Sequence, residues 1–128
     1  MNAGLLASCM IAHFVADFVF QPRDMAINKS KDLYVLGLHA SINYLVFVIA
    51  TVSFLGFDKA IVFAGLNAFI HGLIDWYIWR GFKAFKGKTV NIATYQYWEK
   101  YEFWTVVGFD QLLHGLTIIF ALVIVAGV

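Results

Sequence analysis

Residues 60–79 read AIVFAGLNAFIHGLIDWYIW, an apolar stretch in which only His71 and Asp75 can carry a charge near neutral pH. A helix of this length rises about 30 Å, which is the thickness of the hydrocarbon core of a bilayer. Three further apolar runs have comparable length: residues 3–20, 33–57 and 103–128. We therefore predict an all-α polytopic membrane protein with four transmembrane helices, which form a single domain over residues 1–128.

The composition agrees with a membrane protein. The chain of 128 residues is 62% hydrophobic and 13% charged, with a mean hydropathy of +0.77. Soluble domains are nearer to half apolar and a quarter charged. The net charge of +1 gives no reason to expect a nucleic-acid partner, and membrane lipids are the expected surroundings. The single cysteine, Cys9, excludes a disulfide within the chain.

Lysine and arginine are unevenly distributed among the three predicted loops. Loop 21–32 carries three of the nine basic residues and loop 80–103 carries five, while Lys59 alone lies in the remaining loop. Cytoplasmic loops of membrane proteins are enriched in Lys and Arg. We therefore predict that loops 21–32 and 80–103 are cytoplasmic and that both termini are periplasmic, in a bacterial inner membrane.

Loop 80–103 mixes basic and aromatic side chains, and all the tryptophans lie in or beside it: Trp76, Trp79, Trp98 and Trp104. Tryptophan is enriched where membrane helices meet the headgroup region. The pattern predicts a short interfacial helix within this loop. It would anchor the protein to the membrane surface or, alternatively, form a lid through which a substrate enters.

Seven ionisable side chains lie inside the apolar runs: His13, Asp17, His39, His71, Asp75, Asp110 and His114. Six of them form three i,i+4 pairs, so each pair occupies one face of its helix. Counted from the helix ends, all seven fall within about 5 to 17 Å of the predicted cytoplasmic boundary. A charged side chain at mid-bilayer costs about 2.5 to 3.5 kcal/mol. We therefore expect the seven to form one layer inside the bundle.

Three kinds of chemistry would explain this layer. A divalent metal site is favoured, because imidazole and carboxylate bind Zn, Mn and Fe, and i,i+4 pairs present two ligands to one ion. Metal binding of about 10 to 16 kcal/mol would offset the insertion of three aspartates, which costs about 8 to 10 kcal/mol. A proton or ion path is the second possibility. Asp–His hydrogen bonds that only join the helices are the third.

The segment HFVADFVFQP, residues 13–22, resembles the start of a family of small bacterial and phage membrane proteins, domain of unknown function 3307. His39, HGLIDW at 71–76 and DQLLH at 110–114 resemble later parts of the same family, so the resemblance covers nearly the whole chain. It implies a membrane protein but no particular activity.

The His-x-x-x-Asp spacing of His13/Asp17 and of His71/Asp75 has a fainter resemblance to membrane-bound metal-dependent hydrolases and to the helical zinc phospholipase C group. That resemblance implies several zinc ligands on helices and a hydrolytic reaction.

From these observations we predict a divalent metal centre, with zinc preferred over Mn or Fe. The expected metal ligands are His13, His39, His71, Asp110 and His114, and the expected catalytic residues, as general base or additional ligands, are Asp17 and Asp75. The expected reaction is hydrolysis of a phosphoester or ester in a lipid or lipid-linked substrate at the cytoplasmic leaflet. The alternative is a non-enzymatic role, as a small ion or proton conduit or as a phage-type effector that binds a host membrane protein. Homo-oligomerisation stays open.

Overall fold

A computed structural model describes residues 2–89 and 100–127. Its elements, in chain order, are α1 (Ala3–Phe14), the π-helical segment η1 (Val15–Val19), α2 (Arg23–Asn28), α3 (Leu33–Leu55), α4 (Phe57–Thr89) and α5 (Tyr101–Ala126). The described residues contain no β-strand. The prediction of an all-α protein is therefore confirmed.

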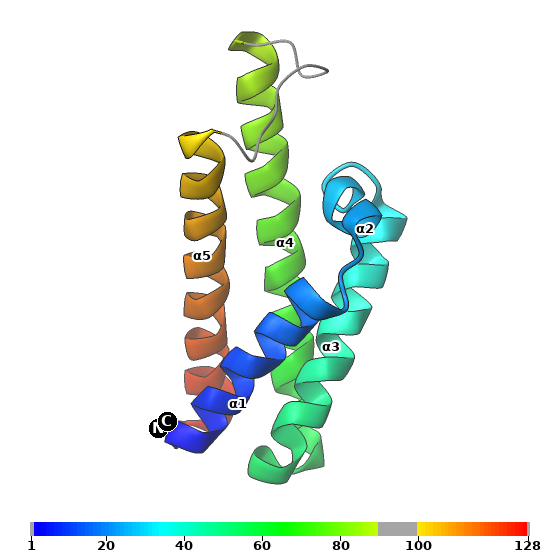
Figure 1. Ribbon diagram of the computed structural model, residues 1–128. Coiled ribbons are helices and arrows are strands. Elements are labelled where there is room, and N and C mark those ends of the chain that lie inside the picture. Colours follow the sequence, from blue (N-terminus) through cyan, green and yellow to red (C-terminus); the bar gives the residue numbers. More distant parts are fainter. Residues whose placement is uncertain (1, 90–99, 128) are drawn as a thin grey trace.

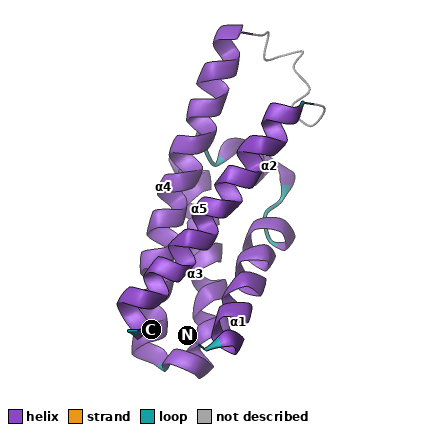
Figure 2. Ribbon diagram, turned by 90° about the vertical axis from the view of Figure 1, so that its left-hand side faces the viewer, coloured by secondary structure: helices purple, strands orange, loops and turns teal. Residues whose placement is uncertain are grey.

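Three long helices, α3, α4 and α5, run side by side, and α1 crosses one face of this group obliquely (Figure 1). Each of the three is long and apolar enough to cross a membrane, whereas the apolar helix Ala3–Val19 is shorter. The two termini lie at the same end of the bundle, here called the terminal end. The opposite end, here called the basic end, is formed by α2, the last turns of α4 and the start of α5 (Figures 1 and 2). This architecture is consistent with an integral membrane protein.

Local sequence explains where the helices begin and end. The Asn2 side chain accepts hydrogen bonds from the first amides of α1, and Asp32 does the same for α3. Pro22 occupies the N-cap position of α2, where a missing amide hydrogen costs nothing. Gly56 alone joins α3 to α4 with a φ of 78°, a left-handed backbone that glycine adopts without strain. Helix α4 begins directly after it, at Phe57.

The predicted loop 80–103 needs correction. Helix α4 continues to Thr89, and α5 starts at Tyr101. No proline follows Trp79, so the helix can continue after the sequence becomes polar. Residues 80–89 of the predicted interfacial segment therefore extend α4, and residues 90–99 lie outside the described part of the chain. The first loop, in contrast, contains the short helix α2, which the sequence analysis missed.

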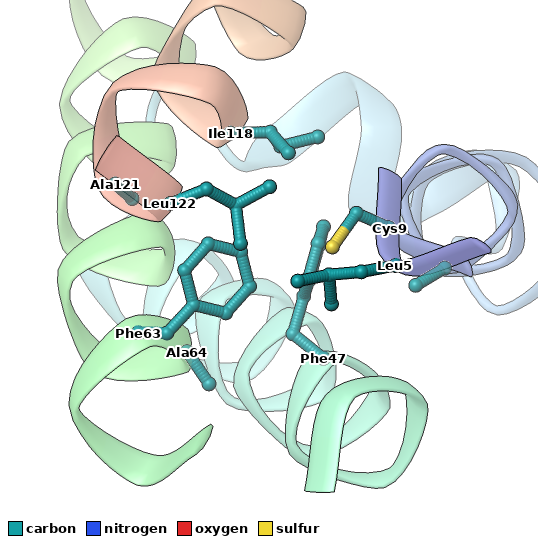
Figure 3. Close-up of a cluster of buried hydrophobic side chains, with 9 residues drawn as sticks. Leu5, Cys9, Phe47, Phe63, Ala64, Ile118, Ala121 and Leu122 are labelled. Atoms are coloured by element: carbon teal, nitrogen blue, oxygen red, sulfur yellow. The ribbon is translucent and has the colours of Figure 1, made fainter. Parts of the chain in front are cut away.

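Apolar side chains fill the terminal end of the bundle. They come from α1, α3, α4 and α5 and include Leu5, Cys9, Phe47, Phe63, Ala64, Ile118, Ala121 and Leu122 (Figure 3). The rings of Phe47 and Phe63 meet edge to face, with centroids 5.8 Å apart. This apolar core leaves the polar side chains of the same helices to gather between it and the basic end.

Candidate metal centre

All seven predicted site residues meet in one buried cluster. Their exposed fractions lie between 0% and 7%: His13, Asp17, His39, His71, Asp75, Asp110 and His114. They come from α1, η1, α3, α4 and α5, so every long helix contributes. The expectation of one polar layer inside the bundle agrees with this placement.

Four atoms form the tightest part of the cluster, here called the four-atom centre. His39 Nε2 lies 3.0 Å from His71 Nε2. Asp75 Oδ2 lies 3.2 Å from each of these nitrogens. Asp17 Oδ1 lies 3.3 Å from His71 Nε2 and 3.5 Å from His39 Nε2. Each of the two nitrogens therefore contacts both carboxylates, and the ligand atoms of His39, His71 and Asp75 all lie within 4.8 Å of one another.

The N–N and N–O distances suit neighbouring ligands of one cation. Zinc holds nitrogen and oxygen ligands at about 2.0 to 2.2 Å, which places neighbouring ligands about 3.3 to 3.6 Å apart. The five contacts of the four-atom centre span 3.0 to 3.5 Å. Hydrogen bonds alone do not explain the five contacts. His39 and His71 can each have only one Nε2–H proton to donate, so at most two donors are present.

The local structure of each helix orients these side chains. Asp17 lies within η1, where the Phe20 amide donates to the Val15 carbonyl at 2.9 Å and widens the turn. Such π-helical turns are common at functional sites. On α4, His71 Nδ1 lies 3.5 Å from Asn43 Nδ2. Asn43 Oδ1 accepts a hydrogen bond from the Asn67 side chain. These contacts hold the ring so that Nε2 points into the four-atom centre.

The three remaining predicted ligands flank the four-atom centre at longer distances. His13 Nδ1 and His114 Nδ1 lie 3.6 and 3.8 Å from Asp17 Oδ2. Asp110 Oδ2 lies 3.6 Å from His114 Nδ1, and the His114 ring stacks on that of His71 with centroids 3.9 Å apart. Gln111 Oε1 accepts a hydrogen bond from His13 Nε2 at 3.0 Å, and Gln111 Nε2 donates to Asp110 Oδ2 at 3.2 Å. This group therefore surrounds the centre and fixes its carboxylates.

Lys29 joins the cluster, although the sequence analysis counted it as a loop charge. Its Nζ lies 2.7 Å from Asp75 Oδ1, and the residue is only 5% exposed. Lys29 follows α2 directly, so this short helix carries the ammonium group back over the bundle interior. Its polar sequence neighbours, Asn28, Ser30 and Lys31, gave no signal of burial.

Several buried polar atoms of the cluster have no hydrogen-bond partner within residues 2–89 and 100–127. They include Asp110 Oδ1, His39 Nδ1 and both ring nitrogens of His114. Buried polar groups are almost always satisfied, so such atoms mark places where an ion, water or substrate belongs.

A family model described as a protein of unknown function (DUF3307) matches residues 5–128. The chain belongs to the DUF3307 family. No curated protein and no solved structure matches it. The fainter resemblance to membrane-bound hydrolases is therefore not supported by these comparisons. The chemistry of this DUF3307 chain is therefore inferred from the geometry of the cluster.

A cavity of about 450 Å³ adjoins the cluster. Asp17, Asp110 and Gln111 line it where it meets the cluster, and Phe82 of α4 and Phe103 of α5 line it toward the basic end. A molecule in this cavity would therefore reach the buried carboxylates from the basic end of the bundle.

Proposed function

We propose that this DUF3307 protein binds one divalent metal ion in the four-atom centre and hydrolyses a phosphoester or ester of a lipid or lipid-linked substrate. The observation that carries the proposal is that two imidazole nitrogens and two carboxylate oxygens make five contacts of 3.0 to 3.5 Å, close to the spacing of neighbouring ligands on one zinc ion. Zinc suits such a donor set best, and Mn²⁺ or Fe²⁺ accept the same ligands.

The charges of the cluster support one ion. Asp17, Asp75 and Asp110 bring three negative charges, and Lys29 brings one positive charge. One divalent cation makes the group neutral, whereas a second would leave an excess of positive charge. Net charge is costly inside a membrane protein, so neutrality is the favoured state. Lys29 thus takes the place that a second metal ion would occupy beside Asp75.

The residues around the centre divide the remaining roles. The metal ion would supply Lewis acidity toward a phosphoryl or carbonyl oxygen and toward water. Asp110 lines the cavity and has an unpartnered oxygen, so it is placed to accept the proton of an attacking water. Gln111 donates a hydrogen bond to the other Asp110 oxygen and orients that carboxylate, and His114 Nδ1 lies 3.6 Å from the same oxygen. This proposal makes Asp17 and Asp75 ligands, one of the two roles predicted for them from sequence, and makes Asp110 the base instead of a ligand.

The apolar core at the terminal end supports a closed site over a conduit. A proton or ion path needs polar groups that reach both faces of the membrane. Between the cluster and the termini, the bundle is filled by side chains such as Phe47, Phe63, Ile118 and Leu122 (Figure 3). The cavity, in contrast, extends toward the basic end.

The proposed base gives a direct test of catalysis. Asp110→Asn should retain the fold and the metal but lower turnover by about 10² to 10⁴-fold, the usual contribution of a general base. Wild type and variant would be reconstituted in liposomes with phospholipids and polyprenyl phosphates, and products measured by mass spectrometry. Asp58→Asn, an exposed aspartate near the terminal end, is the matched control and should keep full turnover. Metal-loaded wild type that releases no product from any phosphate or ester lipid would argue against the hydrolase.

The proposed orientation places the basic end in the cytoplasm and both termini in the periplasm of a bacterium. Lys59 and Lys100 are exposed lysines near opposite ends of the bundle and make a matched pair. In a Cys9→Ala background, an impermeant maleimide should label Lys59→Cys in intact cells, and Lys100→Cys only after permeabilisation. The reverse labelling pattern would overturn the orientation.

A further inference from the structure

We infer that the cavity beside the four-atom centre binds a phosphate-bearing lipid, with Lys31 and Lys83 holding the phosphate and an aromatic wall holding the start of the hydrocarbon chain. This inference rests on the proposed function, because it names the substrate class of the same site. It is argued from the charges and the apolar surface that line the cavity.

The cavity is lined by both acidic and basic side chains. Asp17 and Asp110 line the part next to the cluster, and Lys31 and Lys83 line it as well. Lys83 is eight residues beyond Asp75 on α4, or about 12 Å along the helix axis. Phe103 is seven residues before Asp110 on α5, or about 10 Å. The cavity thus has room for a headgroup and the first carbons of a chain between the carboxylates and the basic end.

Lys83 is held in place by uncharged groups. Its Nζ donates to the Ile27 carbonyl at 3.1 Å and to the Ser30 hydroxyl at 2.7 Å. In the described part of the chain it has no carboxylate partner, unlike Lys29, which pairs with Asp75. An ammonium fixed at a half-buried cavity by neutral acceptors keeps its charge available for an anion.

Lys31 adds a second positive charge to the same cavity. It is exposed and forms no ion pair with any described residue. Lysine binds phosphate as a point charge, and two lysines that line one cavity favour a phosphate over a singly charged carboxylate. The ligand chemistry that these residues select is therefore that of a phosphate group.

The aromatic wall favours a lipid over free phosphate. Trp79 lies 6.0 Å from Phe82 and 5.8 Å from Phe103, measured between ring centroids, and the two phenylalanines lie 6.5 Å apart. All three rings line the cavity and connect α4 to α5. Burial of a hydrocarbon chain against this surface favours binding, whereas an inorganic ion has no apolar area to bury.

The test measures binding without turnover. The probe is a dialkyl ether phosphonate lipid, which has no ester or phosphoester bond, and its control is the same dialkyl ether alcohol without the phosphonate. Native mass spectrometry of the full chain in detergent should show the phosphonate lipid bound and the alcohol bound at least about tenfold more weakly, which corresponds to about 1.4 kcal/mol. Lys31→Gln and Lys83→Gln should each lower binding of the phosphonate lipid several-fold, and the double variant more. Lys59→Gln, an exposed lysine at the terminal end, is the matched control and should have no effect.

Three outcomes would overturn the inference. The first is equal binding of the phosphonate lipid and the alcohol. The second is unchanged lipid binding in Lys31→Gln, an exposed position that the fold does not depend on, together with unchanged binding in a folded Lys83→Gln protein. The third is competition by inorganic phosphate as strong as that of the lipid, with no effect of Phe103→Ala. Because the probe cannot be hydrolysed, a failure of the hydrolase proposal leaves this measurement intact, and a failure of lipid binding leaves metal content unchanged.

Discussion

Replacement of His71 by alanine is expected to remove the bound metal ion. Wild-type protein should carry about one equivalent of Zn, Mn or Fe by elemental analysis, and His71→Ala should carry almost none. His71 Nε2 makes three of the five contacts of the four-atom centre. Loss of residues that only support ligands costs about 10 to 100-fold in metal affinity, so loss of a ligand should cost more than about 100-fold. Metal titration followed by elemental analysis measures the change.

His13→Ala is the matched control for this experiment. His13 lies in the same cluster, but its Nδ1 is 3.6 Å from the far oxygen of Asp17 and its Nε2 contacts Gln111. Its removal should lower metal affinity by no more than about 10 to 100-fold. Equal losses for His13→Ala and His71→Ala would show that the ligand set is wrong. Wild-type protein that takes up no divalent metal would remove the metal centre altogether.

Replacement of Lys29 by methionine is expected to destabilise the protein by about 3 to 5 kcal/mol, because it leaves the Asp75 carboxylate buried without its cation. The Nζ to Oδ1 distance of 2.7 Å and the burial of both residues set this pair apart from surface ion pairs, which contribute about 0 to 1 kcal/mol. Unfolding in detergent, with a chelator present in every sample, measures the effect.

Two further variants serve as controls for the Lys29→Met experiment. Lys31→Met changes an exposed lysine two residues away and should alter stability by less than about 0.5 kcal/mol. Asp75→Asn combined with Lys29→Met should be more stable than the sum of the two single effects predicts, because no unpaired charge is left. If Lys29→Met lowers the free energy of unfolding by less than about 1 kcal/mol, the ion pair contributes no more than an exposed one.

The cluster could be predicted from sequence because a residue's position along an apolar helix gives its depth in the membrane. Ionisable residues such as His71 and Asp75 stand out in an apolar run, and the i,i+4 spacing assigns them to one helix face. Their depth follows from counting residues to the helix end. These rules suffice to place Asp17, His39 and Asp110 at one level of the bundle, although they do not fix which atoms meet.

Lys29 could not be predicted by the same rules. Its burial depends on α2 folding back toward Asp75, which is a tertiary contact with no periodic signal in a short polar segment. The end of α4 was missed for a related reason. Hydropathy detects where the sequence stops being apolar, near Trp79, whereas the helix itself ends at Thr89. The number of membrane crossings stays a prediction, since the helix Ala3–Val19 is shorter than the other three.

His39 shows the limit of reasoning from spacing. It has no i,i+4 partner, so its depth is the only signal that predicts it as a metal ligand, and its Nε2 lies 3.0 Å from His71 Nε2. Only the packing of α3 against α4 brings these two rings together.

The apolar core at the terminal end would also determine where the proposed metal ion is acquired. A hydrated divalent cation cannot pass the packed side chains of Leu5, Phe47, Phe63 and Leu122. Ions could exchange with the cluster only from the compartment that the basic end faces. The metal carried by the protein would then reflect the free metal concentrations of that one compartment, and a change in the metal supply on the other side of the membrane would reach the site only after transport across it.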